Sequence, residues 1–216
     1  MNRKSRSFFV NALTFARVPL IFAWLVLAVV HEQSASASSS SGQVWLAAGA
    51  CLMMLLSGLT DLWDGQLARR WEVVSKLGKM ADPLMDKIFY LVAFPALVWQ
   101  IMHQGDGVHA LVMLFFTIVY MLRDTWVSFL RMISAGCGAD VAAMWLGKVR
   151  TALSFPGAGW VYMYCAFHRM APESWQTPWL TSCYLVEAML LVLTVWSMIS
   201  YTNLYGPYFK KALEQG

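Results

Sequence analysis

Apolar residues fill six long segments of this chain, and short polar stretches separate them. Each segment is near the ~20 residues that an α-helix needs to cross a bilayer. Backbone groups in lipid must bond within their own segment, so helices are predicted and strands are not. Proline inside the third and fifth segments predicts kinks at Pro95 and Pro156. The six predicted spans are roughly 8–30, 44–60 with a continuation to about 69, 83–102, 108–130, 151–167 and 178–201.

The composition supports a membrane protein. Of the 216 residues, 59% are hydrophobic and 13% are charged, and the mean hydropathy is +0.54. A soluble domain needs more polar surface than this, so we predict an all-α integral membrane protein with one six-helix domain over residues 1–216. The four cysteines show no CxxC spacing and are expected to be buried apolar residues with no disulfide or metal role.

Lys and Arg residues alternate from one connector to the next. They occur in the N-terminal segment 1–7, after the second and fourth spans, and in the tail 203–216. The serine-rich loop 31–43 and the connector after the third span lack them, and the connector after the fifth span has only Arg169. The positive-inside rule therefore places both termini in the cytoplasm. Residues 3–38 also imitate a secretory signal, but Arg17 interrupts the apolar stretch, so a retained first helix is predicted.

Four aspartates lie beside the connector between the second and third spans. Asp61 and Asp64 are three residues apart and Asp82 and Asp86 are four apart, so each pair shares one face of a helix. If the connector folds back, the four carboxylates come together and repel one another unless cations neutralise them. Oxygen ligands alone favour Mg²⁺ or Mn²⁺, and the sequence predicts such a site. We also expect Asp82 to cap a helix whose first residue is Pro83.

Small residues stand close to these aspartates. Gly65 and Ala68 lie within about one helical turn of Asp64 and leave room for a bulky ligand beside the backbone. Arg69 shares a helix face with Gly65, where its guanidinium can meet a phosphate. Gly78 removes a side chain near the second aspartate pair.

The whole stretch matches D-x2-D-G-x2-A-R-x8-G-x3-D-x3-D and resembles the signature of the CDP-alcohol phosphotransferases. The resemblance implies a six-helix membrane fold that is usually dimeric, with two Mg²⁺ or Mn²⁺ ions between the four aspartates. It also implies that Asp86 is the catalytic base. The residues that would bind the donor, CDP-diacylglycerol, are Asp61, Gly65, Ala68, Arg69, Ser75 and Gly78.

The first span carries polar residues in its first half. Thr14 and Arg17 are three residues apart and share a helix face, and Asn11 precedes them. An arginine inside the start of a span is costly, so a functional role is expected. We predict that Asn11, Thr14 and Arg17 bind the donor. The simpler alternative is that Arg17 extends to the membrane interface.

A second set of cations surrounds the connector between the fourth and fifth spans. Arg123 lies deep enough in its span to need a partner, and Asp124 is adjacent. Arg131 faces a nearby direction, and Lys148 opens the fifth span. Convergence of Arg123, Arg131 and Lys148 would give a pocket for an acceptor that bears a phosphate. Arg150 points away from the Lys148 face but is included in the predicted acceptor site; alternatively, these cations only enforce topology.

Several segments resemble one branch of that family, the bacterial phosphatidylglycerophosphate synthases. They are NALTFARV, RDTWVSFLR, WLGKVRT and LTVWSMISY, and the likeness extends from about residue 8 to 205. The branch implies sn-glycerol 3-phosphate as acceptor, phosphatidylglycerol phosphate and CMP as products, and the bacterial inner membrane as location. Asp124 stands where the branch usually has Glu, and Arg150 where it often has Lys, so both departures keep the charge.

Other functions stay open at this point. The same chemistry could use another alcohol, such as inositol phosphate, or phosphatidylglycerol to make cardiolipin. A divalent-cation transporter is a different class, although all four aspartates lie at one membrane face. The expected partners are the two substrates, membrane lipids and a second copy of the chain, with no nucleic acid. Glu187 in the sixth span has no assigned role, and the four histidines, all at outer connectors, are expected to be solvated.

Overall fold

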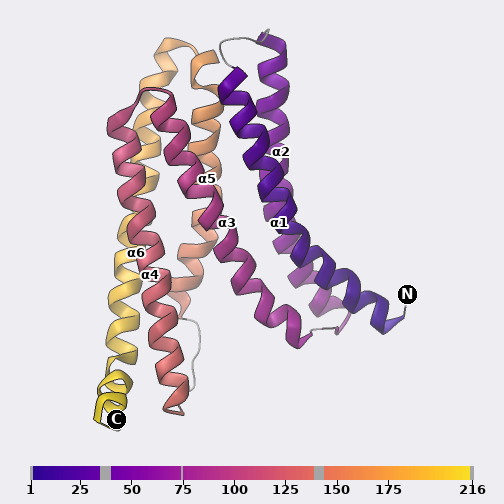
Figure 1. Cartoon of the computed structure of the whole chain (residues 1–216), viewed down its shortest axis with the longest axis vertical. Coiled ribbons are helices and arrows are strands. Elements are labelled where there is room, and N and C mark those ends of the chain that lie inside the picture. The colour runs from indigo at the N-terminus through magenta and orange to yellow at the C-terminus, as the bar shows by residue number, and fades with distance from the viewer. Residues whose placement is uncertain (1, 35–39, 74, 139–143, 215–216) are drawn as a thin grey trace. The chain divides into compact units, whose positions relative to one another are not determined.

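The computed structural model describes residues 2–34, 40–73, 75–138 and 144–214, and these ranges are almost entirely helical, with no strand. The predicted all-α fold with six helices is confirmed. The helices are α1 (Arg3–Ser34), α2 (Ser40–Arg70), α3 (Lys76–His103), α4 (Gly107–Gly136), α5 (Trp145–Phe167) and α6 (Glu173–Glu214), with a 3-10 turn η1 (His168–Met170) before α6 (Figure 1).

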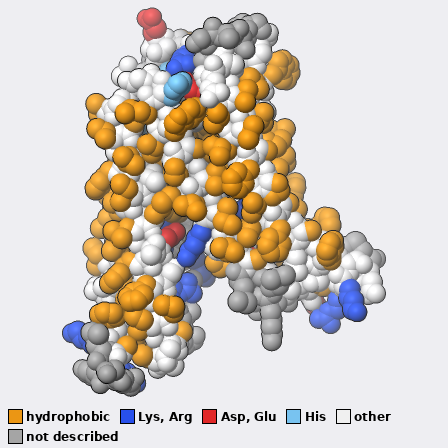
Figure 2. Space-filling view, in the orientation of Figure 1, with side chains coloured by type: hydrophobic (Ala, Val, Ile, Leu, Met, Phe, Trp, Pro, Cys, Tyr) orange, Lys and Arg blue, Asp and Glu red, His pale blue; other side chains and the backbone are white. Residues whose placement is uncertain are grey.

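Five of these helices, α1, α2, α3, α4 and α6, are long and apolar enough to cross a membrane. The remaining helix, α5, is the shortest at 23 residues and carries Lys148 and Arg150 in its first turns. Hydrophobic side chains cover much of the helical surface in the view of Figure 2. Large ones such as Leu111 and Leu185 are more than 60% exposed, as expected of side chains that face lipid.

The helices extend beyond the predicted spans at both ends of the chain. Most of the predicted N-terminal segment 1–7 belongs to α1, and most of the tail 203–216 belongs to α6. Tyr205 in this extension is buried with Val127 and Leu130 of α4 and Tyr201 of α6. The aromatic residues of α6 therefore continue its packing face past the predicted end of the span.

The cap predicted at Asp82 was wrong. The N-cap of α3 is Ser75, whose hydroxyl accepts a hydrogen bond of 2.8 Å from the Gly78 amide. Asp82 and Pro83 lie inside α3, beyond its first turn. Pro83 removes one backbone donor, which a helix can accept when neighbouring groups satisfy the freed carbonyl.

The chain divides into two compact units, which are described separately. Unit 1 contains residues 1–106 and 161–171, and unit 2 contains residues 107–160 and 172–216. In unit 1, α1 packs along both α2 and α3. The buried face of α1 repeats every three or four residues, as expected of one helix stripe, through Val10, Thr14, Arg17, Ile21, Trp24 and Ala28.

The connector between α2 and α3 is only residues 71–75. Its turn is closed by hydrogen bonds from the Val73 amide to the Ala68 carbonyl (3.1 Å) and from the Glu72 amide to the Arg69 carbonyl (3.3 Å). Glu72 adopts a left-handed φ of 53°, as in the Schellman motif that ends many helices. This short turn sets where the aspartates of α3 lie relative to those of α2.

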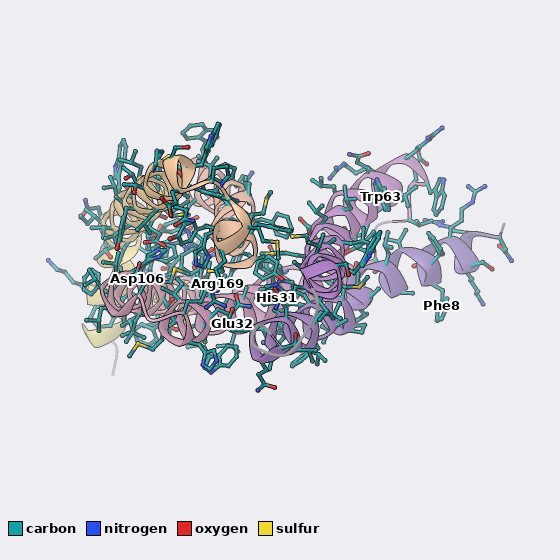
Figure 3. All side chains as sticks on the ribbon, turned by 90° about the horizontal axis from the view of Figure 1, so that it is seen from above. Phe8, His31, Glu32, Trp63, Asp106 and Arg169 are labelled. Atoms are coloured by element: carbon teal, nitrogen blue, oxygen red, sulfur yellow. The ribbon has the colours of Figure 1, made fainter. Side chains whose placement is uncertain are left out.

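A polar cluster ties together the C-terminal ends of α1 and α3 and the turn η1. Glu32 is 4% exposed; it forms an ion pair with Arg169 (3.1 Å) and accepts a hydrogen bond from Gln104 (2.7 Å). Figure 3 shows the labelled side chains of Glu32 and Arg169 close together. His31 is also buried here, so the expectation of a solvated histidine was wrong at this position.

Unit 2 is built on the contact between α4 and α6, with the first part of α5 beside them. Gly157 lets α5 approach α6 closely, because a Cβ at this position would lie 2.7 Å from Cδ1 of Leu190. His109 is fully buried in this unit and not solvated, since its imidazole pairs with Glu187 of α6.

Candidate active site

Arg17 of α1 is the centre of a charged cluster in unit 1. Its guanidinium is 3% exposed and donates to Asp61 (2.5 Å), Asp86 (2.6 Å) and Asp64 (3.3 Å). The three carboxylates come from two helices, α2 and α3, and one cation from α1 joins them. The buried stripe of α1 explains this placement, because Arg17 follows Thr14 and precedes Ile21 on the face that packs against both helices.

Thr14 lies one turn before Arg17 and donates a hydrogen bond of 2.8 Å to Oδ2 of Asp64. Asp64 is buried, whereas the side chains of Asp61 and Asp86 are 48% and 38% exposed. The cluster thus has a closed side at Asp64 and an accessible side at Asp61 and Asp86. A ligand can reach the carboxylates only from the accessible side.

Asp82 lies one turn before Asp86 on α3 and is half-buried. Among the described residues, no three His, Cys, Asp or Glu side chains lie close enough together to hold one ion between them. The carboxylates of α2 and α3 instead surround the Arg17 guanidinium, which shows that they can share one cation. Their chemistry, oxygen ligands from aspartate only, suits Mg²⁺ or Mn²⁺.

The predicted donor residues form two small groups around this cluster. In the first, the Ser75 hydroxyl donates to Oδ1 of Asn11 (2.9 Å), and a Cβ at Gly78 would lie 3.1 Å from that hydroxyl. In the second, the Arg69 guanidinium lies 3.6 Å from where a Cβ of Gly65 would be. Gly78 and Gly65 therefore leave space that a side chain would fill.

A second charged cluster lies in unit 2. Asp124 of α4 accepts from its neighbour Arg123 (2.8 Å) and from Arg150 of α5 (2.5 Å). Arg123 also donates to the Ser197 hydroxyl of α6 at 2.5 Å. The guanidinium of Arg150 stacks on the ring of Tyr120, 4.0 Å from its centroid.

Both arginines keep buried donors without a hydrogen-bond partner. Arg123 is 6% exposed and Arg150 is 2% exposed. The unpaired atoms are Nε of Arg123 and both Nε and Nη1 of Arg150. Unpaired buried donors are costly, so this cluster is suited to bind an anion that accepts from them.

Of the predicted acceptor cations, the structure joins two at one carboxylate. Arg150, predicted to point away from the Lys148 face, meets Arg123 at Asp124. Arg131 is half-buried and Lys148 is exposed. Ser197 and Tyr201 of α6 were missed, because a serine and a tyrosine in an apolar span carry no signal of a charged partner.

The family model of the CDP-alcohol phosphatidyltransferases matches residues 8–206. The chain belongs to this family. Its match covers both clusters, since Asn11 and Tyr205 lie near its two ends.

Two relatives of this CDP-alcohol phosphatidyltransferase have different activities in their names. One is a cardiolipin synthase (CMP-forming) of Streptomyces coelicolor, 30% identical over 84% of this chain and 83% of the relative. The other is the CDP-diacylglycerol–glycerol-3-phosphate 3-phosphatidyltransferase of Escherichia coli, 28% identical over 74% of this chain and 79% of the relative. Membership in the family gives a membrane transferase of phospholipid synthesis that uses a CDP-alcohol and an alcohol acceptor.

We predict that replacing Arg17 by Gln destabilises the protein in the absence of divalent ions. The change leaves Asp64 buried without its cation, and breaking a buried ion pair costs about 3–5 kcal/mol. The midpoint of thermal unfolding in detergent should fall, and Mn²⁺ should raise it more in the variant than in the wild type. Arg17→Lys keeps a cation and serves as the control. An unfolding midpoint unchanged in Arg17→Gln would contradict this role.

Proposed function

We propose that the chain transfers the phosphatidyl group of CDP-diacylglycerol to sn-glycerol 3-phosphate, giving phosphatidylglycerol phosphate and CMP. The observation that carries this proposal is the pair of buried arginines, Arg123 and Arg150, with unpaired N–H groups. Two guanidiniums against one carboxylate, Asp124, leave a positive charge in excess. A phosphomonoester on the acceptor would accept from the unpaired donors and balance that charge.

The four aspartates are proposed to bind two divalent ions, Mg²⁺ or Mn²⁺. Asp61 and Asp86 would face the donor, because their carboxylates are the accessible ones. Asp64, held by Thr14, would keep its orientation throughout. When bound, the ions would neutralise the pyrophosphate of the donor and stabilise charge on the departing CMP.

Arg17 is proposed to change partners when substrate and ions are bound. Its guanidinium and the divalent ions would compete for the oxygens of Asp61, Asp64 and Asp86. Released from them, Arg17 would donate to a phosphate of CDP-diacylglycerol, a polyanion that guanidinium groups bind well. Near it, the space at Gly65 and Gly78 would admit the cytidine nucleotide.

Asp86 is proposed as the base. Its carboxylate would accept the proton of the acceptor hydroxyl while that oxygen attacks the phosphorus attached to diacylglycerol. The new oxygen–phosphorus bond forms as the bond to CMP breaks, and CMP leaves with the electron pair. The carboxylate oxygen that now accepts from Arg17 at 2.6 Å is the one that would take this proton.

Phosphatidylglycerol is the second candidate acceptor, favoured by the likeness to a cardiolipin synthase. It also bears a phosphate, but as a diester within a membrane lipid. Inositol phosphate is a third possibility within the same chemistry. We propose that both termini and the aspartate cluster lie on the cytoplasmic face, because Lys and Arg alternate between the connectors. The family resemblance supports the further proposal of a homodimer in the bacterial inner membrane.

The acceptor can be identified directly. Purified protein with CDP-diacylglycerol and Mn²⁺ is offered glycerol 3-phosphate, phosphatidylglycerol, inositol phosphate, inositol or serine, and CMP release and the lipid product are measured. We expect turnover with glycerol 3-phosphate and with none of the other four acceptors. Cardiolipin formed from phosphatidylglycerol would overturn this acceptor and leave the transfer chemistry intact, whereas metal uptake into vesicles without CDP-diacylglycerol would favour a transporter.

Asp86→Asn should lower kcat by about 10²-fold or more, since the amide cannot accept the proton. The apparent KM for CDP-diacylglycerol should change by less than about threefold, because the shape of the side chain is kept. Asp106→Asn, in the connector that follows α3, is the matched control. A variant of Asp86 that retains wild-type kcat would rule out the base.

Arg150→Gln should raise the KM for glycerol 3-phosphate by about tenfold or more, the effect of losing a charge-assisted hydrogen bond. The KM for CDP-diacylglycerol should stay near the wild-type value. Lys210→Gln removes an exposed cation of α6 and provides the comparison. Equal effects of Arg150→Gln on both substrates would argue against an acceptor site at this cluster.

A further inference from the structure

His109 and Glu187 form a buried ionisable pair inside unit 2. Nε2 of His109 lies 2.8 Å from Oε1 of Glu187, and the two residues are 0% and 3% exposed. The ring of Tyr184, one turn before Glu187 on α6, lies 4.9 Å from the imidazole. Ionisable groups inside membrane spans are costly and are kept for a reason, yet nothing in the proposed chemistry uses this pair.

The pair contributes more to specificity than to net stability. Desolvation of a buried ion pair roughly cancels its attraction, but separating the partners is strongly unfavourable. The other oxygen of Glu187, Oε2, has no hydrogen-bond partner, so His109 is its principal polar contact. Sliding α4 along α6 by one turn, about 5.4 Å, would separate the two groups and leave a carboxylate buried alone.

The same register places Arg123 beside its partners on α6. Arg123 lies fourteen residues after His109 on α4, and Tyr201 lies fourteen residues after Glu187 on α6. The guanidinium of Arg123 lies 5.1 Å from the ring centroid of Tyr201 and donates to Ser197, one turn earlier. The two helices therefore run parallel with one constant offset over about 21 Å.

Between these two levels, the buried threonine hydroxyls of the two helices bond within their own helices. Thr117 donates to the Met113 carbonyl of its own helix, and Thr194 donates to the Leu190 carbonyl of its own helix. The neighbouring buried side chains, such as Phe116, are apolar. Apolar contacts are not directional, so the middle of the contact between α4 and α6 fixes the register less strictly than its polar ends do.

We propose that His109 and Glu187 are positioning residues for the acceptor site. They hold α4 in register with α6, so that Arg123 stays opposite Ser197 and Tyr201 while its hydrogen bonds are redistributed to a bound anion. The acceptor site needs this pair, because Arg123 cannot itself hold α4 in register with α6 while it exchanges hydrogen-bond partners. The inference rests on the anion-binding role proposed above for Arg123 and Arg150.

The test uses the full chain in detergent and two readouts. Inorganic phosphate is the probe of the anion site, titrated by calorimetry, and the KM values for glycerol 3-phosphate and CDP-diacylglycerol are measured separately. The variants are Glu187→Gln, which keeps a hydrogen-bond acceptor, and the double replacement His109→Leu with Glu187→Leu. The double replacement leaves neither partner buried alone, so it should fold.

We expect the double variant to bind phosphate about tenfold more weakly and to show a similar rise in the KM for glycerol 3-phosphate. Its KM for CDP-diacylglycerol should stay within about twofold, and Glu187→Gln should resemble the wild type. Thr117→Val and Thr194→Val are the matched controls, because each removes a buried polar group of the same helices that does not join them.

Three outcomes would overturn the inference. If phosphate binding and both KM values of the folded double variant match the wild type, the pair has no positioning role. If the double variant alters both substrates equally, or the threonine controls behave as it does, the role is general packing. If the wild type binds no phosphate, the anion site fails as well. If phosphate binding depends on the pair but glycerol 3-phosphate is not turned over, only the proposed acceptor is overturned.

Discussion

The buried guanidinium of Arg17 among three carboxylates is the interaction on which unit 1 depends. Neither the Arg17 guanidinium nor the Asp64 carboxylate could be buried alone at an acceptable cost, so each requires an opposite charge to be in place. Because Arg17 belongs to α1 and its partners to α2 and α3, the requirement fixes three helices at once. The apolar residues on the same stripe of α1 pack in the arrangement that these ion pairs favour.

The two charged clusters have opposite imbalances. Around Arg17, three carboxylates face one cation, and Asp82 adds a fourth negative charge nearby, so this cluster attracts further cations. Around Asp124, two guanidiniums face one carboxylate, so that cluster attracts an anion. The first imbalance suits the metal ions proposed to accompany a pyrophosphate, and the second suits the phosphate of the proposed acceptor.

Much of this arrangement could be predicted from the sequence, and the exceptions share a physical cause. The lengths of the apolar segments predicted six helices, and the aspartate spacing predicted one functional cluster. Which side chains meet across helices depends on how each helix is rotated about its axis, and the sequence does not specify that rotation. For this reason the sequence did not predict three sets of contacts. They are the sharing of Arg17 by Asp61, Asp64 and Asp86, the approach of Arg150 to Asp124, and the partner of Glu187. The start of α3 was misplaced because Ser75 is as good a cap as Asp82 and stands earlier in the chain.

The brevity of the turn between α2 and α3 has an evolutionary consequence. Each residue of a helix turns the chain by about 100°, so a single-residue deletion near the start of α3 would swing Asp82 and Asp86 away from α1. The left-handed Glu72 and the two backbone hydrogen bonds that close this turn leave little freedom to absorb such a change. Length variation should therefore be eliminated by selection at residues 71–75, even where the identities of those residues drift.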